Sequence, residues 1–402
     1  MASNRLELPG VTTDLSSFQH DGSQLLPTAR EIAAVCAEGA AEIDRDGAYP
    51  AKEMATIAAT GLLSAPLRPS SGGLGWGSEP GSMTTLLRVL TILGSGNLSV
   101  ARLYEGHVNA LLLIQQFGSP DQIARMTVDT IDMRHLFAVW NTEAADGVHL
   151  TPLPDGRFTL QGAKSFASGA GFVVRPLLTA KLPDGGWQLV LPGDEVMAAS
   201  IDQTGWLPIG MKASASGRID FSGIPATEDT LIGSPGDYYR QPWFSAGALR
   251  FAAAQLGGAI ALVDAARADL QTNQRTDDDA QRARMASIAI SIESCLLLLD
   301  HAATLSDCSQ FGGATDPSIS NLEMTTYANL CRTAIERCCL DAIEYAHRSV
   351  GARALLKPHP IERISRDLTM YLRQPAPDAA LRAVGAFALN QSISLLDAWG
   401  RA

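Results

Sequence analysis

Two polar residues three positions apart, Tyr104 and His107, are the side chains in this sequence best suited to acid–base chemistry. The apolar spacing over residues 99–117 predicts a helix, and a separation of three places both side chains on one of its faces. Imidazole titrates near neutral pH, so His107 could donate a proton to a bound reactant, with Tyr104 beside it as a substrate contact. A histidine held by hydrogen bonds inside a helical core has the same spacing, and the sequence leaves that structural role open.

Other common catalytic motifs are absent from the sequence. It has no P-loop, no strand-linked G-x-G-x-x-G, no G-x-S-x-G and no H-E-x-x-H. Its seven histidines are never spaced as metal-ligand pairs, so we predict no metal site. Any redox chemistry would therefore depend on a bound organic cofactor.

The composition is that of an ordinary folded chain of two or three domains. Of the 402 residues, 46% are hydrophobic and 18% are charged, which excludes general disorder. The net charge of −11 argues against nucleic acid as a partner, because binding a phosphate backbone needs a basic face. It permits a small-molecule substrate held by one or two local arginines. Six cysteines without a C-x-x-C pair predict reduced, mostly buried thiols.

A cytoplasmic location is expected from the pattern of apolar residues. The first 28 residues are polar and lack the apolar core of a signal peptide. No run reaches 18 uninterrupted apolar residues, so we predict neither a membrane span nor a membrane partner.

Three successive patterns of hydrophobic residues along the chain predict an α+β multi-domain fold. After an N-terminal extension over 1–27, helical spacing over 28–135 predicts an N-terminal helical domain. A period of two with recurring turn residues over 136–235 predicts a central antiparallel β-barrel or sandwich domain. Helical spacing returns over 236–402 and predicts a C-terminal four-helix bundle. The helices are expected at 28–47, 51–60, 83–93, 99–117, 244–271, 284–306, 324–349 and 379–400, and strands near 158–160, 187–192 and 217–224.

Four segments resemble, in the same order, motifs of the acyl-CoA dehydrogenase family of flavoproteins. "FAVWNTEAADG" (137–147) is similar to the family's strand that ends in a Thr-Glu pair. "LQGAKSFASGAG" (160–171) is similar to its Gly-x-Lys-x-aromatic segment, and "GMKASASGRIDFSGI" (210–224) to its Gly-Met-Arg strand entry. "RSVGARALLKPHPIERISRD" (348–367) resembles its late helix, glycine turn and Arg-Asp pair. The resemblance implies the helix–β–helix fold and FAD as the cofactor.

The resemblance also implies that the β-domain holds the flavin. Trp140, Asn141 and Thr142 match positions that meet the pyrimidine edge of the ring, where donors stabilise the charge that develops on reduction. Phe166 matches an aromatic residue that covers the ring face, and Ser168 matches a hydroxyl near it. Packing in the core of a barrel is the alternative role for the two aromatic residues.

Further FAD contacts are implied from the bundle. Arg275 matches an arginine that reaches FAD from a neighbouring subunit, and Arg348 and Gly351 match the turn on the adenine side. Three aspartates follow Arg275 and disfavour a pyrophosphate there, so a solvated helix end is its alternative role. Sharing FAD between subunits implies a homodimer or homotetramer, which the apolar residues on more than one side of 284–306 favour over burial within a monomer.

The catalytic base of the family is missing from this sequence. Abstraction of the α-proton of a thioester needs a carboxylate over the flavin. The family's usual glutamate lies nine residues after the arginine of the Arg-Asp pair, and counting from Arg366 leads to Pro375. The second position that the family uses, within 245–249, also has no acid, and Asp378 is the nearest candidate if the register shifts.

Two residues bear on the substrate through the same resemblance. Arg250 matches an arginine of the family's substrate channel and could hold a CoA phosphate or a substrate anion, although a solvated helix end is an equal alternative. Val148 lies where the family usually has a Ser-Asp pair near the thioester, which weakens ordinary acyl-CoA binding.

The main interpretation is therefore an FAD-dependent oxidoreductase of acyl-CoA dehydrogenase type, acting on an acyl-CoA or similar acyl substrate through a non-standard base. The first alternative is a flavin-dependent monooxygenase or oxidase on the same fold, in which His107 would assist the reaction with oxygen. The second is a catalytically inactive homologue that keeps the fold for interaction.

Overall fold

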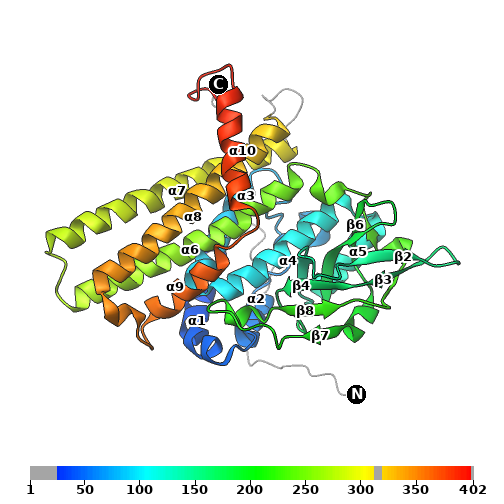
Figure 1. Cartoon of the computed structure of the whole chain (residues 1–402), viewed down its shortest axis with the longest axis horizontal. Helices are drawn as coiled ribbons and strands as arrows, with labels where there is room; N and C mark the ends of the chain where they lie inside the picture. The colour runs from blue at the N-terminus through cyan, green and yellow to red at the C-terminus, as the bar shows by residue number, and fades with distance from the viewer. Residues whose placement is uncertain (1–24, 312–318, 400–402) are drawn as a thin grey trace.

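The computed structural model describes residues 25–311 and 319–399, and its elements follow one another in three blocks (Figure 1). The first block is helical, as predicted, and contains one helix, α5, that the apolar pattern did not separate. Most of the predicted extension over 1–27 lies outside the described residues. The helices of this block are α1 (Leu25–Asp46), α2 (Ala51–Ala59), α3 (Met83–Gly96), α4 (Leu98–Phe117) and α5 (Pro120–Ile131).

Local capping fixes both ends of α4, which runs between the bundle and the β-domain (Figure 1). The side-chain Oδ1 of Asn97 accepts hydrogen bonds from two backbone N–H groups of the first turn, which have no partner within the helix. Gly118 ends α4, and a capping box of Ser119 and Gln122 starts α5 immediately afterwards. The side chains of α4 are therefore held in a defined register against the β-domain.

The central block folds into two sheets. The larger has the order β10–β6–β5–β2–β3–β9 with β1 on β5, and the smaller has the order β4–β8–β7. Most pairs are antiparallel as predicted, but β1 runs parallel to β5, and so does β2 at a single residue pair. The chain passes through the smaller sheet in β4 before it returns as β5, and this crossover permits the parallel pairing. The strands are β1 (Phe137–Trp140), β2 (His149–Pro152), β3 (Phe158–Gln161), β4 (Ala163–Ala167), β5 (Arg175–Lys181), β6 (Trp187–Val190), β7 (Ser200–Asp202), β8 (Gly217–Asp220), β9 (Pro225–Ala226) and β10 (Leu231–Ile232).

The C-terminal block is helical, as predicted. Three long helices pack side by side, and the shorter α9 packs against α6 (Figure 1). The helix predicted at 379–400 instead begins at Pro377 and ends at Asn390, and it projects away from the other helices. Pro375 and Pro377 account for the break, because proline cannot continue a helix from α9. The helices are α6 (Trp243–Thr272), α7 (Asp279–Phe311), α8 (Asn321–Val350), α9 (Pro360–Tyr371) and α10 (Pro377–Asn390).

Two helices, α6 and α7, have the length and hydropathy of a membrane span, a test that the core helices of folded proteins also pass. The apolar window of α6 is 78% buried within the chain, as expected for a core helix, whereas that of α7 is 33% buried. Ile290 and Leu297, two turns apart on α7, are exposed. The outer face of α7 is therefore apolar and uncovered in the single chain.

Candidate active site

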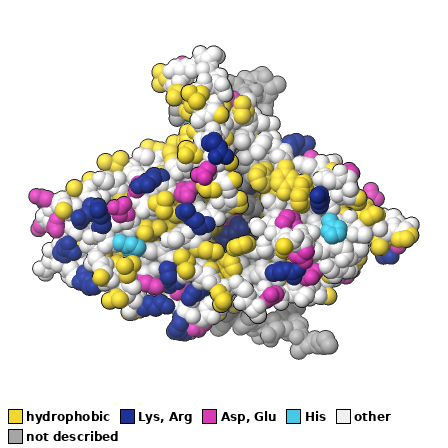
Figure 2. All heavy atoms as spheres, viewed as in Figure 1, with side chains coloured by type: hydrophobic (Ala, Val, Ile, Leu, Met, Phe, Trp, Pro, Cys, Tyr) yellow, Lys and Arg dark blue, Asp and Glu magenta, His cyan; other side chains and the backbone are white. Residues whose placement is uncertain are grey.

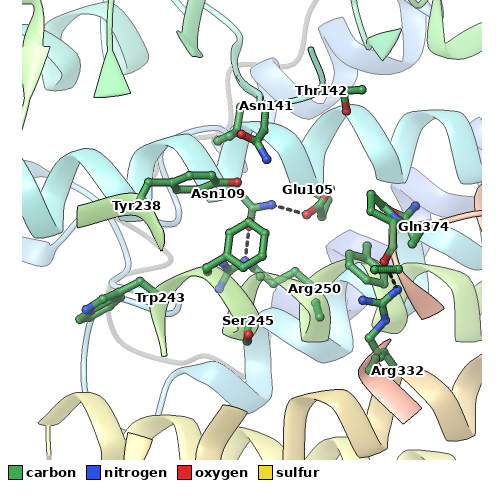
Figure 3. A pocket seen from close by; sticks show the side chains of 18 of the residues that line it. Glu105, Asn109, Asn141, Thr142, Tyr238, Trp243, Ser245, Arg250, Arg332 and Gln374 are labelled. Atoms are coloured by element: carbon green, nitrogen blue, oxygen red, sulfur yellow. Dashed lines mark hydrogen bonds between the residues drawn. The ribbon is translucent and has the colours of Figure 1, made fainter. Parts of the chain in front are cut away.

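A cavity of about 450 Å³ opens where the β-domain meets the helices. Figure 2 shows a hollow on this face with basic side-chain atoms inside it. Its wall comes from α4, the end of β1, β4, the start of α6, α8 and the segment after α9 (Figure 3). A second cavity of about 260 Å³ adjoins it, and the two share wall residues Arg102, Thr142, Phe166, Gln374 and Pro375. This volume is in the range of small-molecule sites.

Helix α4 directs two sets of polar side chains to different surroundings. Arg102, Glu105 and Asn109, spaced by three and four, line the cavity. Tyr104 and His107 share a different side of the helix, which packs into the core. The sequence pattern correctly grouped these two residues, but the cavity is on the other side.

His107 is completely buried and does not line the cavity. Its Nε2–H donates to the Leu63 carbonyl over 2.8 Å, and its Nδ1 accepts from the Phe137 N–H over 3.1 Å. Burial lowers the pKa of His107 to about 4, against the opposing effect of the Leu63 carbonyl, so the ring is neutral at physiological pH. The Tyr104 hydroxyl donates to the Leu62 carbonyl over 2.9 Å and is equally buried. These contacts correct the predicted catalytic and substrate roles: both residues hold α4 to its neighbours.

Four polar side chains form a continuous hydrogen-bonded chain along the cavity wall, and Figure 3 shows three of them, Glu105, Asn109 and Arg250. The Glu105 carboxylate accepts hydrogen bonds from Arg102 and from the amide of Asn109. The side-chain Oδ1 of Asn109 in turn accepts a hydrogen bond from Arg250 Nε. Glu105 is 1% exposed and Arg250 6% exposed. Burial lowers the pKa of Arg250 to about 10, although Glu105 and Tyr238 oppose the shift, so the guanidinium stays charged at neutral pH.

Asn141 presents an amide donor to the cavity. Its Oδ1 accepts two hydrogen bonds, from the Thr179 hydroxyl over 2.9 Å and from the Tyr239 hydroxyl over 2.8 Å. The buried ammonium of Lys164 donates to the same threonine over 2.8 Å, which fixes the direction of that hydroxyl. With its oxygen engaged, Asn141 turns its Nδ2 toward the cavity (Figure 3). The site therefore contains a preorganised hydrogen-bond donor.

Phe166 is a large aromatic ring left uncovered in the walls of both cavities. The register of β4 shifts between Lys164 and Ala167, and Phe166 adopts a φ of 51°. This bulge turns the ring out of the strand's alternation, at a backbone conformation that side-chain-bearing residues rarely adopt. The residue is 60% exposed and meets the Trp206 ring edge-on, with centroids 5.9 Å apart. Such strain is typical of ligand sites, and the ring offers a flat face to a planar group.

The second cavity has a wall rich in hydrogen-bond donors. The hydroxyl oxygens of Ser214 and Ser216 lie 2.9 Å apart, within hydrogen-bond distance. The Ser216 hydroxyl donates to the Ser168 hydroxyl over 3.3 Å. The indole N–H of Trp206 is buried and has no hydrogen-bond partner among the described residues. Arg102 and Arg373 also line this cavity, and no acidic residue does. Hydroxyls, an unpartnered N–H and guanidinium groups together suit an anionic group such as a phosphate.

The remaining residues predicted near the flavin are also at the cavity. Trp140 lines it, donates from its indole N–H to the Ser168 carbonyl over 3.1 Å and packs against Phe221, so it serves both in the wall and in the core. Thr142 lines both cavities, and its carbonyl accepts the Ser165 N–H over 3.0 Å. Arg250 lines the larger cavity, as described above.

Pro375 lies in the walls of both cavities. Counting nine residues from Arg366 therefore leads to a residue in the cavity wall, and that residue is a proline. Asp378, three residues further, is exposed and does not line either cavity. Ser245, Gly247 and Ala248 line the larger cavity from the start of α6 without an acid among them.

Four other predicted residues lie away from the cavity. Val148 is buried, and its N–H donates to the Glu143 carboxylate over 2.8 Å, so it is not a substrate contact within this chain. Arg275, Arg348 and Gly351 lie near the α6–α7 turn, at the end of the bundle far from the β-domain (Figure 1).

Sequence reasoning missed the residues that give the cavity its charge. Glu105 and Asn109 follow Arg102 by three and seven positions, a helical spacing that could have indicated a shared polar face. Arg332 on α8 had no comparable signal, because only the packing of α8 against α6 brings it to the cavity.

In residues 25–311 and 319–399, no group of three or more His, Cys, Asp or Glu side chains is placed to hold a metal ion.

The fold and this site define a class of flavin-dependent oxidoreductases. The acyl-CoA dehydrogenase N-terminal domain matches residues 20–134, and the acyl-CoA dehydrogenase C-terminal domain matches residues 244–373. The chain belongs to the acyl-CoA dehydrogenase family.

Its relatives include both monooxygenases and a dehydrogenase. It is 22% identical to dibenzothiophene monooxygenase from Mycolicibacterium goodii, over 96% of this chain and 98% of the relative. It is also 22% identical to mitochondrial isobutyryl-CoA dehydrogenase from Dictyostelium discoideum, over 93% of this chain and 89% of the relative. Among solved structures, the complex of TdsC from Paenibacillus sp. A11-2 with FMN and indole superposes with a TM-score of 0.83 at 22% identity, covering 92% of this chain and 98% of that one.

Proposed function

We propose that this protein is a reduced-flavin-dependent monooxygenase and not an acyl-CoA dehydrogenase. The observation that carries the proposal is Pro375, which lies in the cavity wall where the resemblance places the dehydrogenase glutamate. Proline accepts no proton, and the family's second position for the base is equally empty of acids. The one acid in the wall of the larger cavity, Glu105, is already held by two donors. A site of this kind favours chemistry that needs no α-proton abstraction.

The cavity residues fit a flavin. Phe166 provides an uncovered aromatic face, and Asn141 provides a donor held in place by Thr179. Trp206, whose indole N–H has no partner among the described residues, lines the adjoining cavity together with serine hydroxyls and arginines, where a phosphate would find donors. These features favour a planar ring with a charged tail over a purely apolar ligand.

Reduced flavin would supply two electrons to dioxygen, so that one oxygen atom enters the substrate, the other leaves as water, and the flavin is released oxidised. The chain's own contribution is positioning and exclusion of water. Phe166 would support one face of the ring, and the Asn141 amide would donate to an electron-rich edge. The monooxygenases among the relatives support this reaction type.

We further propose FMN in place of the FAD expected from the sequence. Arg275 donates to the Ser349 carbonyl over 3.1 Å and lies 3.8 Å from Asp278, and Arg348 pairs with Glu344 at 3.4 Å. These arginines are already engaged within the chain, which disfavours a pyrophosphate and adenine. A single phosphate needs only the donors of the second cavity, and the FMN complex of the structural relative TdsC supports this choice.

Two further proposals concern the whole protein. The uncovered apolar face of α7 with Ile290 and Leu297 favours a homodimer or homotetramer in which a second copy covers it. A cytoplasmic location is proposed from the sequence, where reduced flavin from a reductase is available.

The function is tested by adding photoreduced FMN, under argon, to the purified protein and then mixing with ¹⁸O₂-saturated buffer and a test substrate. Dibenzothiophene and sodium benzenesulfinate serve as a neutral and an anionic sulfur substrate. One ¹⁸O atom in the product, detected by mass spectrometry, is the expected result. Product with solvent oxygen only, or no product from a wider panel, would overturn the proposal.

A second arm tests the dehydrogenase alternative directly. The protein reconstituted with FAD is mixed anaerobically with butyryl-CoA, octanoyl-CoA and isobutyryl-CoA. We expect the flavin absorbance to stay unchanged, because no free carboxylate faces the ring. Bleaching without added reductant would instead establish a dehydrogenase, and Glu105→Gln would then show whether Glu105 is its base.

A further inference from the structure

We propose that the substrate of this site is an organic anion, with a carboxylate, sulfinate or sulfonate group on an apolar or aromatic body. This inference rests on the proposed function and names its substrate class. Three observations carry it: the charge of the cavity wall, the lack of a carboxylate partner for Arg250, and the aromatic residues that line the same cavity.

The wall of the larger cavity is basic in an acidic protein. The wall contains three guanidinium groups, from Arg102, Arg250 and Arg332, and one carboxylate, from Glu105. The wall therefore has an excess of two positive charges. The whole chain has a net charge of −11, so this local excess is the reverse of the average surface. Buried charges need compensation, and a ligand anion would supply it.

Arg250 is the cation with the least internal compensation. It is 6% exposed, and its single hydrogen bond among the described residues runs from Nε to the neutral Asn109 amide. It makes no ion pair in the described part of the chain, since Glu105 is occupied by Arg102 and Asn109. Its terminal nitrogens are therefore available to a ligand, and two parallel N–H groups match an oxyanion.

Arg332 adds a second cation on the opposite helix. It donates to the Pro375 carbonyl over 3.0 Å, and its guanidinium lies 5.4 Å from the centre of the Phe251 ring. These neutral contacts orient the group without cancelling its charge. Arg250 on α6 and Arg332 on α8 thus make this side of the cavity positive.

Aromatic side chains line the same cavity as Arg250. The rings of Tyr238 and Phe244 meet edge-on at 5.3 Å, and Trp243 completes this part of the wall. Burial raises the pKa of Tyr238, so its hydroxyl is neutral and adds no negative charge. An apolar or aromatic body with one charged group is complementary to this combination.

The flavin phosphate is the competing anion. The hydroxyls and the unpartnered indole N–H are in the second cavity with Arg102 and Arg373, whereas Arg250 and Arg332 do not line that cavity. We therefore assign the phosphate to the second cavity and the substrate anion to Arg250. The experiment separates these two sources of negative charge.

Binding is measured on the full-length protein with oxidised FMN and no reductant, by calorimetry with sodium benzenesulfonate and with benzenesulfonamide. These probes share a ring and a similar size and differ in charge. We expect benzenesulfonate, and sodium benzoate as the carboxylate arm, to bind at least about tenfold more tightly than the sulfonamide. Equal or tighter binding of the sulfonamide would overturn the inference without any variant, and would leave the oxygenation test of the proposed function unaffected.

Variants then assign the contact. Arg250→Met should weaken benzenesulfonate binding at least about tenfold and leave sulfonamide binding unchanged, while Arg250→Lys should retain part of it. Arg337→Met, which removes an exposed arginine of α8 paired with Asp341, is the matched control and should change neither. If Arg250→Met fails to fold, Arg332→Met replaces it, with a loss of at least about threefold expected. Weaker FMN binding with unchanged riboflavin and probe binding would assign Arg250 to the phosphate and contradict the inference.

Discussion

Asn109 accepts a hydrogen bond from Arg250, and this contact joins α4 to α6 across the wall of the cavity. Through its amide nitrogen the same Asn109 side chain donates to Glu105. One neutral residue therefore links a buried carboxylate to a buried guanidinium group. The arrangement orients both charged groups while leaving the outer part of Arg250 to the cavity.

Glu105→Leu should destabilise the protein by about 3 kcal/mol, because it leaves Arg102 partly buried without its carboxylate. Urea denaturation measures the change in the free energy of unfolding. The control is Asp341→Asn, which breaks the exposed Arg337–Asp341 pair and should cost less than about 0.5 kcal/mol. Equal losses in the two variants would show that the Glu105 pair contributes no more than a surface pair.

Phe166→Ala should raise the dissociation constant of FMN at least about tenfold, because it removes the uncovered aromatic face of the cavity. Its effect on the free energy of unfolding should stay within about 0.5 kcal/mol, since the side chain is mostly exposed. Leu207→Ala, at an 89% exposed position near Trp206, is the control for loss of exposed apolar surface. Unchanged FMN fluorescence quenching in Phe166→Ala would rule out the ring as a flavin platform.

Asn141→Asp should weaken FMN binding at least about tenfold, because the cavity-facing donor becomes an acceptor with a negative charge. Thr179→Val should have a smaller effect in the same direction, since it releases one of the two bonds that orient the amide. Asn273→Asp, at the exposed end of α6, provides the matched control. Retained affinity in Asn141→Asp would mean that the amide does not face the flavin.

The free energy of unfolding should fall as the pH decreases from about 6.5 to about 4, partly through His107. Unfolded His107 takes up a proton near pH 6.5, whereas the buried ring takes one up only near pH 4, so the unfolded state binds more protons in this window. The full contribution is about 3 kcal/mol, present above pH 6.5 and lost below pH 4.

His107→Leu should lower stability at pH 7.5 and reduce the slope of stability against pH between 6.5 and 4.5. His149→Leu, at an exposed position, serves as the control and should keep the slope of the parent protein. Oxygenation per folded molecule should be unchanged in His107→Leu, because the ring does not reach the cavity. A selective loss of turnover with a normal slope would restore the catalytic role first predicted for His107.

Local patterns in the sequence were sufficient to predict most of the fold. The apolar spacing over 99–117 predicted α4, and the alternation around Phe158 and Leu160 predicted β3. The order of the family-like segments led to the right family, and the count from Arg366 to Pro375 identified a position that the structure places in the cavity wall. These features depend on neighbours in the chain, so they can be read without knowing the packing.

The tertiary structure decided which of these residues meet the ligand. Helical spacing groups Tyr104 with His107 and Arg102 with Glu105 equally well, and only the packing of α4 against β1 makes the first pair core and the second pair cavity wall. The direction of the Asn141 amide depends on a residue 98 positions away, and the exposure of Phe166 on a bulge in β4. The sequence determined the elements and the missing carboxylate, because both are properties of local residue types. The charge and shape of the site arise from contacts between distant segments, which no local pattern contains.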